Sequence, residues 1–154
     1  MFMKRLIILL AAAAVFTSCT KSENLNICLA NGYDQTIIVS GCGEDFSIKP
    51  GKVFIIATCF AQGDNYTLDT PELWQTFFYS KCESLTIYAE DKTVLDTWTK
   101  DDTRHGNPFD IANWSNEEKV ESGVNGGPME GPQYTFLVSA YTHTKRNLTY
   151  VIAP

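Results

Sequence analysis

Apolar and polar residues alternate in several short runs along this chain, which is the pattern of β-strands with one buried face. The first clear run covers residues 25–29, where three apolar residues alternate with a polar residue and a cysteine. Asn31-Gly32 follows, a dipeptide that suits a tight hairpin turn because both central residues need positive φ. The chain returns through residues 36–39, so we expect a first hairpin here.

Further runs of this kind predict six more strands. The run 53–60 is continuously apolar and rich in β-branched residues, which is typical of a strand buried on both faces. A charged turn separates 84–89 from 93–98 and predicts a second hairpin. The C-terminal runs predict a third. The six strands are residues 46–48, 53–60, 84–89, 93–98, 133–141 and 147–152.

Helix signals are short and occur twice. Thr70-Pro71-Glu72 offers an N-cap, a proline at the first helical position and an acidic residue in the first turn. Ser115 and Glu118 have the spacing of a capping box. Residues 100–132, which include the second of these helices, are rich in turn residues, and a connection of that length is often functional.

Many short strands, terminal hairpins and few helices together predict an all-β fold. We expect a β-sandwich of about eight strands with one or two short helices, with a small barrel as the alternative. Residues 25–154 have the length of one domain.

The N-terminal 18 residues have the organisation of an export signal. Lys4 and Arg5 precede an apolar core at 6–16, which is shorter than the roughly 20 residues needed to span a bilayer. Two small residues then precede Cys19. We therefore expect residues 1–18 to be cleaved and the polar residues 19–24 to form a tether.

Phe16-Thr17-Ser18-Cys19 resembles a bacterial lipobox. The resemblance implies that the Cys19 thiol is diacylated, that the chain is cut before it, and that the new amine is acylated. Two or three acyl chains anchor a protein stably, whereas one does so only marginally. The alternative is that Cys19 is an incidental thiol in a secreted leader.

The residues after Cys19 also resemble known lipoprotein signals. Thr20, which stands where inner-membrane lipoproteins tend to have Asp, implies the outer membrane. Lys21 and Glu23 partly resemble a charged surface-export tag, which favours the cell surface over the periplasm.

The four cysteines other than Cys19 predict two disulfides, since an even number in an exported chain is typical of bridges. Three pairings are open, and buried free thiols are the alternative. No CxxC pair points to a metal site. The four are Cys28, Cys42, Cys59 and Cys82.

Charge argues against one class of partner. The chain has 12 basic and 18 acidic residues, and loss of Lys4 and Arg5 with the leader leaves 10 and 18, a net charge of −8. An acidic surface repels phosphate backbones, so we expect no nucleic-acid partner.

No motif predicts a catalytic residue, a cofactor or a metal. Asp101, Asp102 and His105 could ligate a metal, but turn-rich loops commonly carry such residues in solvent. Among the aromatics, Trp98 and Trp114 are the candidate ligand contacts if exposed, because Trp stacks on sugars and anchors protein interfaces. The alternative is that they fill the core.

The outline as a whole resembles small export lipoproteins of Gram-negative gut anaerobes with an immunoglobulin-like β-sandwich. Besides the lipobox, the pieces that carry the resemblance are residues 31–32, 48–51 and 84–88. The function of that family is unknown. We therefore expect a non-enzymatic, lipid-anchored envelope module that binds a glycan or an envelope protein. The alternatives are a hydrolase or protease-inhibitor-like protein using residues 100–132, or a structural envelope component.

Overall fold

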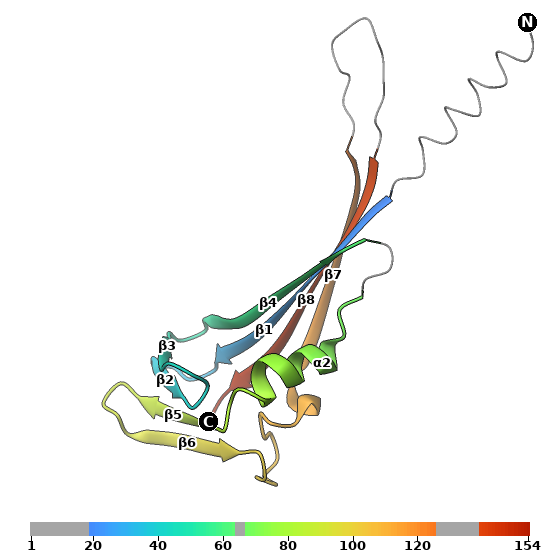
Figure 1. The fold of residues 1–154 in the computed structure, drawn as a ribbon. Coiled ribbons are helices and arrows are strands. Elements are labelled where there is room, and N and C mark those ends of the chain that lie inside the picture. Colours follow the sequence, from blue (N-terminus) through green and yellow to red (C-terminus); the bar gives the residue numbers. More distant parts are fainter. Residues whose placement is uncertain (1–18, 64–66, 126–138) are drawn as a thin grey trace, which may run out of the picture.

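Two four-stranded β-sheets make up most of the computed structural model, which describes residues 19–63, 67–125 and 139–154 (Figure 1). Within these residues the predicted all-β sandwich of about eight strands is confirmed. Sheet A has the order β4-β1-β8-β7 and sheet B the order β3-β2-β5-β6. The strands are β1 (Cys19–Asn31), β2 (Ile37–Ser40), β3 (Phe46–Ile48), β4 (Val53–Gln62), β5 (Ser84–Ala89), β6 (Val94–Thr99), β7 (Ser115–Asn125) and β8 (Ser139–Ile152).

The first and last strands lie side by side at the centre of sheet A. β1 pairs in parallel with β8 along its whole length, from Cys19 opposite Ala140 to Asn31 opposite Ile152. β4 and β7 pair antiparallel on either side. The two ends of the described chain are thus joined by one continuous ladder.

Only one half of sheet A covers the core. Alternate residues of β1 and β8 at that end are fully or almost fully buried and pack with the inner residues of sheet B. Burial of each such aliphatic side chain contributes about 1.5–3 kcal/mol. The main contributors are Leu25, Ile27, Leu29, Leu148 and Ile152 from sheet A, and Ile37, Val39, Leu85 and Ile87 from sheet B.

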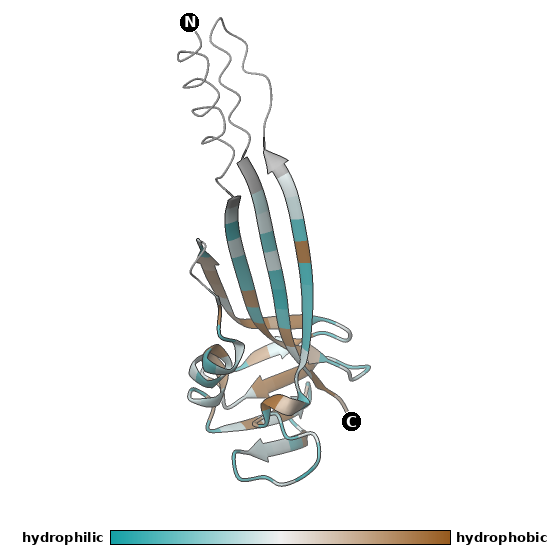
Figure 2. Cartoon of the chain, turned by 90° about the vertical axis from the view of Figure 1, so that its right-hand side faces the viewer, coloured by the Kyte–Doolittle hydropathy of each residue, from teal (hydrophilic) through white to brown (hydrophobic). Residues whose placement is uncertain are grey.

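The other half of sheet A projects from the sandwich as an arm (Figure 1). We define the arm as residues 19–24 of β1, 119–125 of β7 and 139–145 of β8, which are joined by register. Its described residues are mostly hydrophilic (Figure 2). Residues 19–24, predicted as a tether, are therefore part of a paired strand.

The predicted first hairpin is wrong, because β1 and β2 belong to different sheets. Asn31 is buried where the chain crosses between them. Its side-chain Nδ2 donates to the carbonyls of Gln35 and Ile48, both at 2.8 Å, and its Oδ1 accepts from the Tyr33 amide. β1 pairs with β4 and β8 in sheet A rather than with β2. The hydrogen bonds of Asn31 therefore hold the point where the chain crosses from sheet A to sheet B.

The second predicted hairpin is confirmed, and the third is wrong. β5 and β6 pair antiparallel across a turn in which Lys92 has a φ of 70°. β8 runs without interruption from Ser139 to Ile152, so residues 139–141 and 147–152 belong to one strand. Residues 133–138 of the predicted strand lie outside the described residues.

One of the two predicted helices is present. α2 (Thr70–Trp74) is followed directly by the π-helical turn η2 (Gln75–Tyr79), and its N-cap is Asp69, one residue before the predicted cap. The Asp69 carboxylate accepts from the Glu72 amide at 3.0 Å.

The segment that begins at Ser115, predicted as a helix, is strand β7 instead. β7 pairs with β8 from Ser115 opposite Thr149 to Asn125 opposite Ser139. A weak local capping signal does not outweigh eleven paired positions in a sheet.

One of the two predicted disulfides is present among the described cysteines. Cys42 and Cys82 are bridged, while Cys28 and Cys59 are free thiols. Cys59 pairs with Leu25, whose side chain faces the core, whereas Cys28 lies between two core residues of β1 and so faces away. Because they lie on opposite faces of sheet A, these two thiols cannot bond.

No helix in the described part of the chain is long and apolar enough to span a membrane.

Candidate functional site

Both tryptophans predicted as ligand contacts lie in the core. Trp98 is 6 % exposed and Trp114 is 7 % exposed. The Trp114 ring contacts Phe78 with centroids 4.8 Å apart, and its Nε1 donates to the Pro108 carbonyl at 2.8 Å. Trp98 packs edge-on against Tyr150. Their prediction as contacts is therefore wrong, because both rings fill space between the sheets and the loop.

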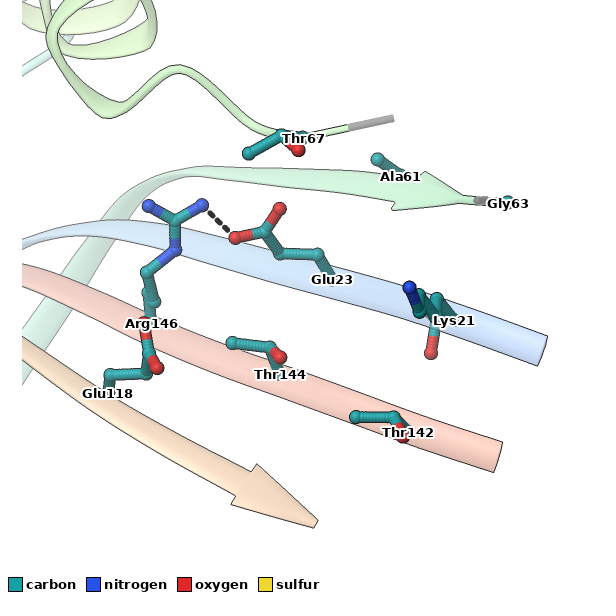
Figure 3. A pocket seen from close by; sticks show the side chains of 10 residues that line it. Lys21, Glu23, Ala61, Gly63, Thr67, Glu118, Thr142, Thr144 and Arg146 are labelled. Atoms are coloured by element: carbon teal, nitrogen blue, oxygen red, sulfur yellow. Dashed lines mark ion pairs between the residues drawn. The ribbon is translucent and has the colours of Figure 1, made fainter. Parts of the chain in front are cut away.

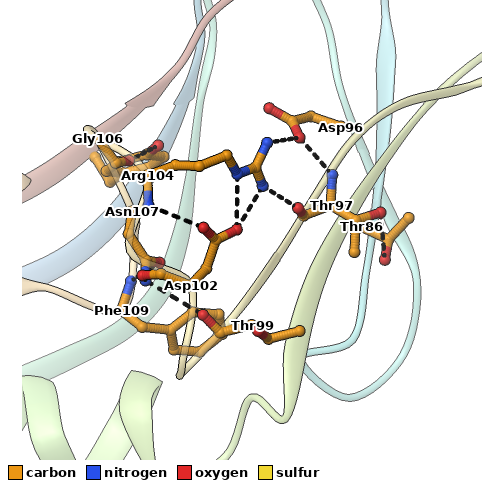
Figure 4. Close-up of polar contacts among 10 residues, drawn as sticks. Thr86, Asp96, Thr97, Thr99, Asp102, Arg104, Gly106, Asn107 and Phe109 are labelled. Atoms are coloured by element: carbon orange, nitrogen blue, oxygen red, sulfur yellow. Dashed lines mark hydrogen bonds and ion pairs between the residues drawn. The ribbon is translucent and has the colours of Figure 1, made fainter.

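The loop between β6 and β7 is ordered by its own polar side chains (Figure 4). Asn107 donates from Nδ2 to the carbonyls of Thr99 and Asp102, and its Oδ1 accepts from the Phe109 amide at 2.9 Å. Tyr150 adds a hydrogen bond from its hydroxyl to the Gly106 carbonyl at 2.6 Å.

Arg104 ties the same loop to sheet B. Its guanidinium forms ion pairs with Asp96 and Asp102 and donates to the Thr97 carbonyl (Figure 4). It also lies 5.5 Å from the centre of the Trp98 ring. The hydrogen bonds from Arg104 lower the pKa of Asp102, and those to Asp102 and Asp96 raise the pKa of Arg104. This cluster thus holds the loop in place.

The acidic and histidine residues of this loop do not form a metal centre. Asp102, His105 and Asp110 line a shallow hollow of about 330 Å³, which Asp101 does not line. Within the described residues no three His, Cys, Asp or Glu side chains converge closely enough to hold a metal ion. The Asp102 carboxylate is instead bound by the Arg104 guanidinium.

A second polar hollow, of about 340 Å³, lies where the arm meets the sandwich (Figure 3). Glu23 of β1 and Arg146 of β8 point toward one another there and form an ion pair, and each side chain is 13 % exposed. Arg146 also donates to the Thr70 hydroxyl and the Leu68 carbonyl, and Glu23 accepts from the Leu68 amide. The pair therefore fastens the segment before α2 to sheet A.

The face of sheet A that points away from the core carries exposed aliphatic side chains. Val53, Ile55 and Val151 are 52–54 % exposed. Ala30 of β1 pairs with both Val53 and Val151, and Cys28 pairs with Ile55, so the five residues are neighbours on one face. We call Ala30, Cys28, Val53, Ile55 and Val151 the outer patch.

Four residues of the outer patch, Cys28, Val53, Ile55 and Val151, line a shallow groove of about 450 Å³. A polar ladder bounds it toward the arm, in which the Thr58 hydroxyl donates to Asn26 and the Asn26 amide donates to Asn147, both at 2.9 Å. Glu117 and Lys145 contribute charged side chains to the lining. An apolar centre with a polar rim is the composition of protein-binding surfaces.

This surface is not evident from the sequence, because the apolar run 53–60 predicts a strand buried on both faces, and that prediction is wrong. β4 is instead an edge strand of sheet A, and Val53, Ile55 and Phe60 are exposed. A continuous apolar run occurs both in central strands and in edge strands that pair with another chain, so the run alone does not distinguish the two. The absence of any charged residue from 53–60 is the sequence signal for an edge strand that could accept a partner.

No known protein family, characterised protein or solved structure matches this chain.

Proposed function

We propose that this chain is a lipid-anchored module of the cell envelope that binds a partner protein through the outer patch. The observation that carries the proposal is the exposure of three aliphatic side chains in one groove of a sheet whose other face is a packed core. Contiguous exposed apolar surface on a small domain is typical of interaction sites.

The anchor rests on the lipobox-like residues 16–19 and on the position of Cys19. β1 begins at Cys19, at the free end of the arm (Figure 1). A lipid on Cys19 would place that end at the membrane. Thr20 directly after it supports the outer membrane, and Lys21 and Glu23 favour the cell surface.

The outer patch lies at the opposite end of sheet A. Ala30 is 11 positions along β1 from Cys19, which at roughly 3.3 Å per residue is about 35 Å. The arm would act as a spacer that presents the patch away from the lipid headgroups. A surface held there can meet another envelope protein.

The chemistry of the patch favours a protein over a glycan. Sugar rings stack on flat exposed aromatics, but the five residues of the outer patch include no aromatic, and Trp98 and Trp114 are buried. Branched aliphatic side chains beside an amide ladder instead match the apolar centre and polar rim of protein interfaces.

Site-specific photocrosslinking in living cells tests the proposal. A photoreactive amino acid replaces Ile55 in the outer patch or, as a matched control, Val120 on β7, since both are just over half exposed in the same sheet. A discrete protein adduct at position 55 and none at 120 is expected. Adducts equal at both positions, or absent at 55, would remove the basis for the proposal.

A further inference from the structure

The free edge of β4 is the feature that indicates how a partner binds. Within the described residues β4 pairs with β1 alone, so its other edge has backbone N–H and C=O groups available to a further strand. The ten residues Val53–Gln62 include no charged side chain. Uncharged, exposed edges of this kind readily accept another strand.

The opposite edge of the same sheet is protected. β7 carries four charged residues within 117–121, namely Glu117, Glu118, Lys119 and Glu121. Charged side chains on an edge strand oppose pairing with another chain. The two edges of sheet A thus differ in the property that governs strand addition.

β4 also carries exposed side chains and borders a hollow that the side chains of an added strand could contact. On the outer face, Val53, Ile55 and Phe60 are more than half exposed. At its other end an open hollow of about 470 Å³ is lined by Phe60, Ala61, Gln62, Thr67 and Leu68. A register shift opposite Ile27 and Cys28 bends the edge between these two regions.

We propose that β4 accepts an extended, uncharged segment of a partner protein as a fifth strand of sheet A. The segment would carry β-branched or aromatic residues at alternate positions, because these continue the row formed by Val53, Ile55 and Phe60. This inference rests on the proposed function, since it specifies how the outer patch meets its partner.

A second copy of this chain fits the edge less well. Two copies related by a two-fold axis pair antiparallel at a shared edge, which points their Cys19 ends in opposite directions. Two lipids could not then enter one membrane. The net charge of −8 on each mature chain also opposes self-association.

Peptide binding to the lipidated protein in nanodiscs tests strand addition. The probe is a fluorescent peptide of residues 53–62 with Cys59→Ser and flanking lysines for solubility, because it is an uncharged segment with β-branched residues. Its control carries N-methyl groups on alternate residues, which keep the side chains and block one hydrogen-bonding edge. The peptide is expected to bind and to slow hydrogen exchange in β4 but not in β7.

N-methylation is expected to weaken this binding by about tenfold or more, because it removes several backbone hydrogen bonds. Ile55→Lys in the protein should weaken it by a similar factor, and Val120→Lys by less than about twofold. Binding that tolerates N-methylation, absence of protection in β4, or a β4-paired dimer in the peptide-free protein would overturn the inference.

The two proposals fail in different ways. An adduct at position 55 in cells without protection of β4 by the peptide would retain the partner and reject strand addition. The N-methylated control needs no protein variant, so the result holds even if Ile55→Lys fails to fold.

Discussion

At the base of the arm, the ion pair between Glu23 and Arg146 connects three parts of the chain. It joins β1 to β8 and, through hydrogen bonds to Leu68 and Thr70, holds the segment that leads into α2. The exposure of 13 % for each side chain means that removal of one partner leaves a charge largely shielded from water.

We expect Glu23→Gln to lower the free energy of unfolding by about 3 kcal/mol, since it removes the ion-pair partner of the largely buried Arg146. Urea denaturation measures the loss. The matched control is Glu121→Gln on the arm, where the Lys119–Glu121 pair is 74 % and 57 % exposed and should contribute less than about 1 kcal/mol. Equal losses in the two variants would show that the buried pair has no special role.

Tyr150 predicts a pH dependence on the alkaline side. Burial, together with the charge of Asp96, raises its pKa from 10.0 to about 12. The folded state therefore favours the neutral phenol, so this stabilisation is complete below pH 10 and is lost as pH rises toward about 12.

Tyr150→Phe is expected to lower stability by about 1 kcal/mol at neutral pH, because the Gly106 carbonyl loses its donor. The variant should also lose less stability than the wild type between about pH 10 and 12. Denaturation curves across that range compare the two chains, which share their other tyrosines. Parallel curves would contradict the assignment.

At the scale of elements, the sequence predicted the strands better than their partners. The predicted bounds of β3, β5 and β6 agree with the structure to within one residue, because turn residues on both sides of a short alternating run mark where the strand begins and ends. The partners of β1 are β4 and β8. Asn26 of β1 and its partner Asn147 of β8 are 121 residues apart in the sequence, and no local pattern encodes such a pairing.

The candidate site was harder to predict for the same reason. Trp98 and Trp114 were open to either interpretation, since a large aromatic suits both a core and a binding surface. The outer patch arises only when β4, β1 and β8 assemble with Val53, Ala30 and Val151 in one row.

The Cys42–Cys82 bridge gives a prediction at the same scale. It spans a sequence separation of 40, which in the chain-entropy description corresponds to about 4 kcal/mol. Cys42→Ser with Cys82→Ser should lower stability by about that amount. Titration of the unfolded, unreduced chain should find two thiols, Cys28 and Cys59, besides any at Cys19. Four reactive thiols would contradict the bridge.

At the scale of the whole molecule, the arm separates the two ends of sheet A. One end carries Cys19 and the other carries the outer patch, and the Glu23–Arg146 pair fastens the base of the arm to the segment before α2. With the proposed anchor at Cys19, the paired arm would hold the outer patch at a more defined distance from the membrane than a flexible tether would.

We expect cells grown with labelled palmitate to label the protein, and Cys19→Ala to abolish both the label and membrane association. Cys28→Ala is the control and should keep the label, because its thiol is buried in sheet A. Protease added to intact cells should cleave the wild-type chain if it lies on the cell surface. Label that persists in Cys19→Ala would reject the anchor.

A single crosslinking experiment can test the anchor and the outer patch together. A photoreactive residue at position 55 is introduced into the wild-type chain and into Cys19→Ala, and adducts are compared after illumination of intact cells. A lipid-anchored chain that binds through the outer patch should give a discrete protein adduct in the membrane fraction of the wild type, and Cys19→Ala should lose that adduct. An adduct of equal yield in both chains, or none in either, would contradict this expectation.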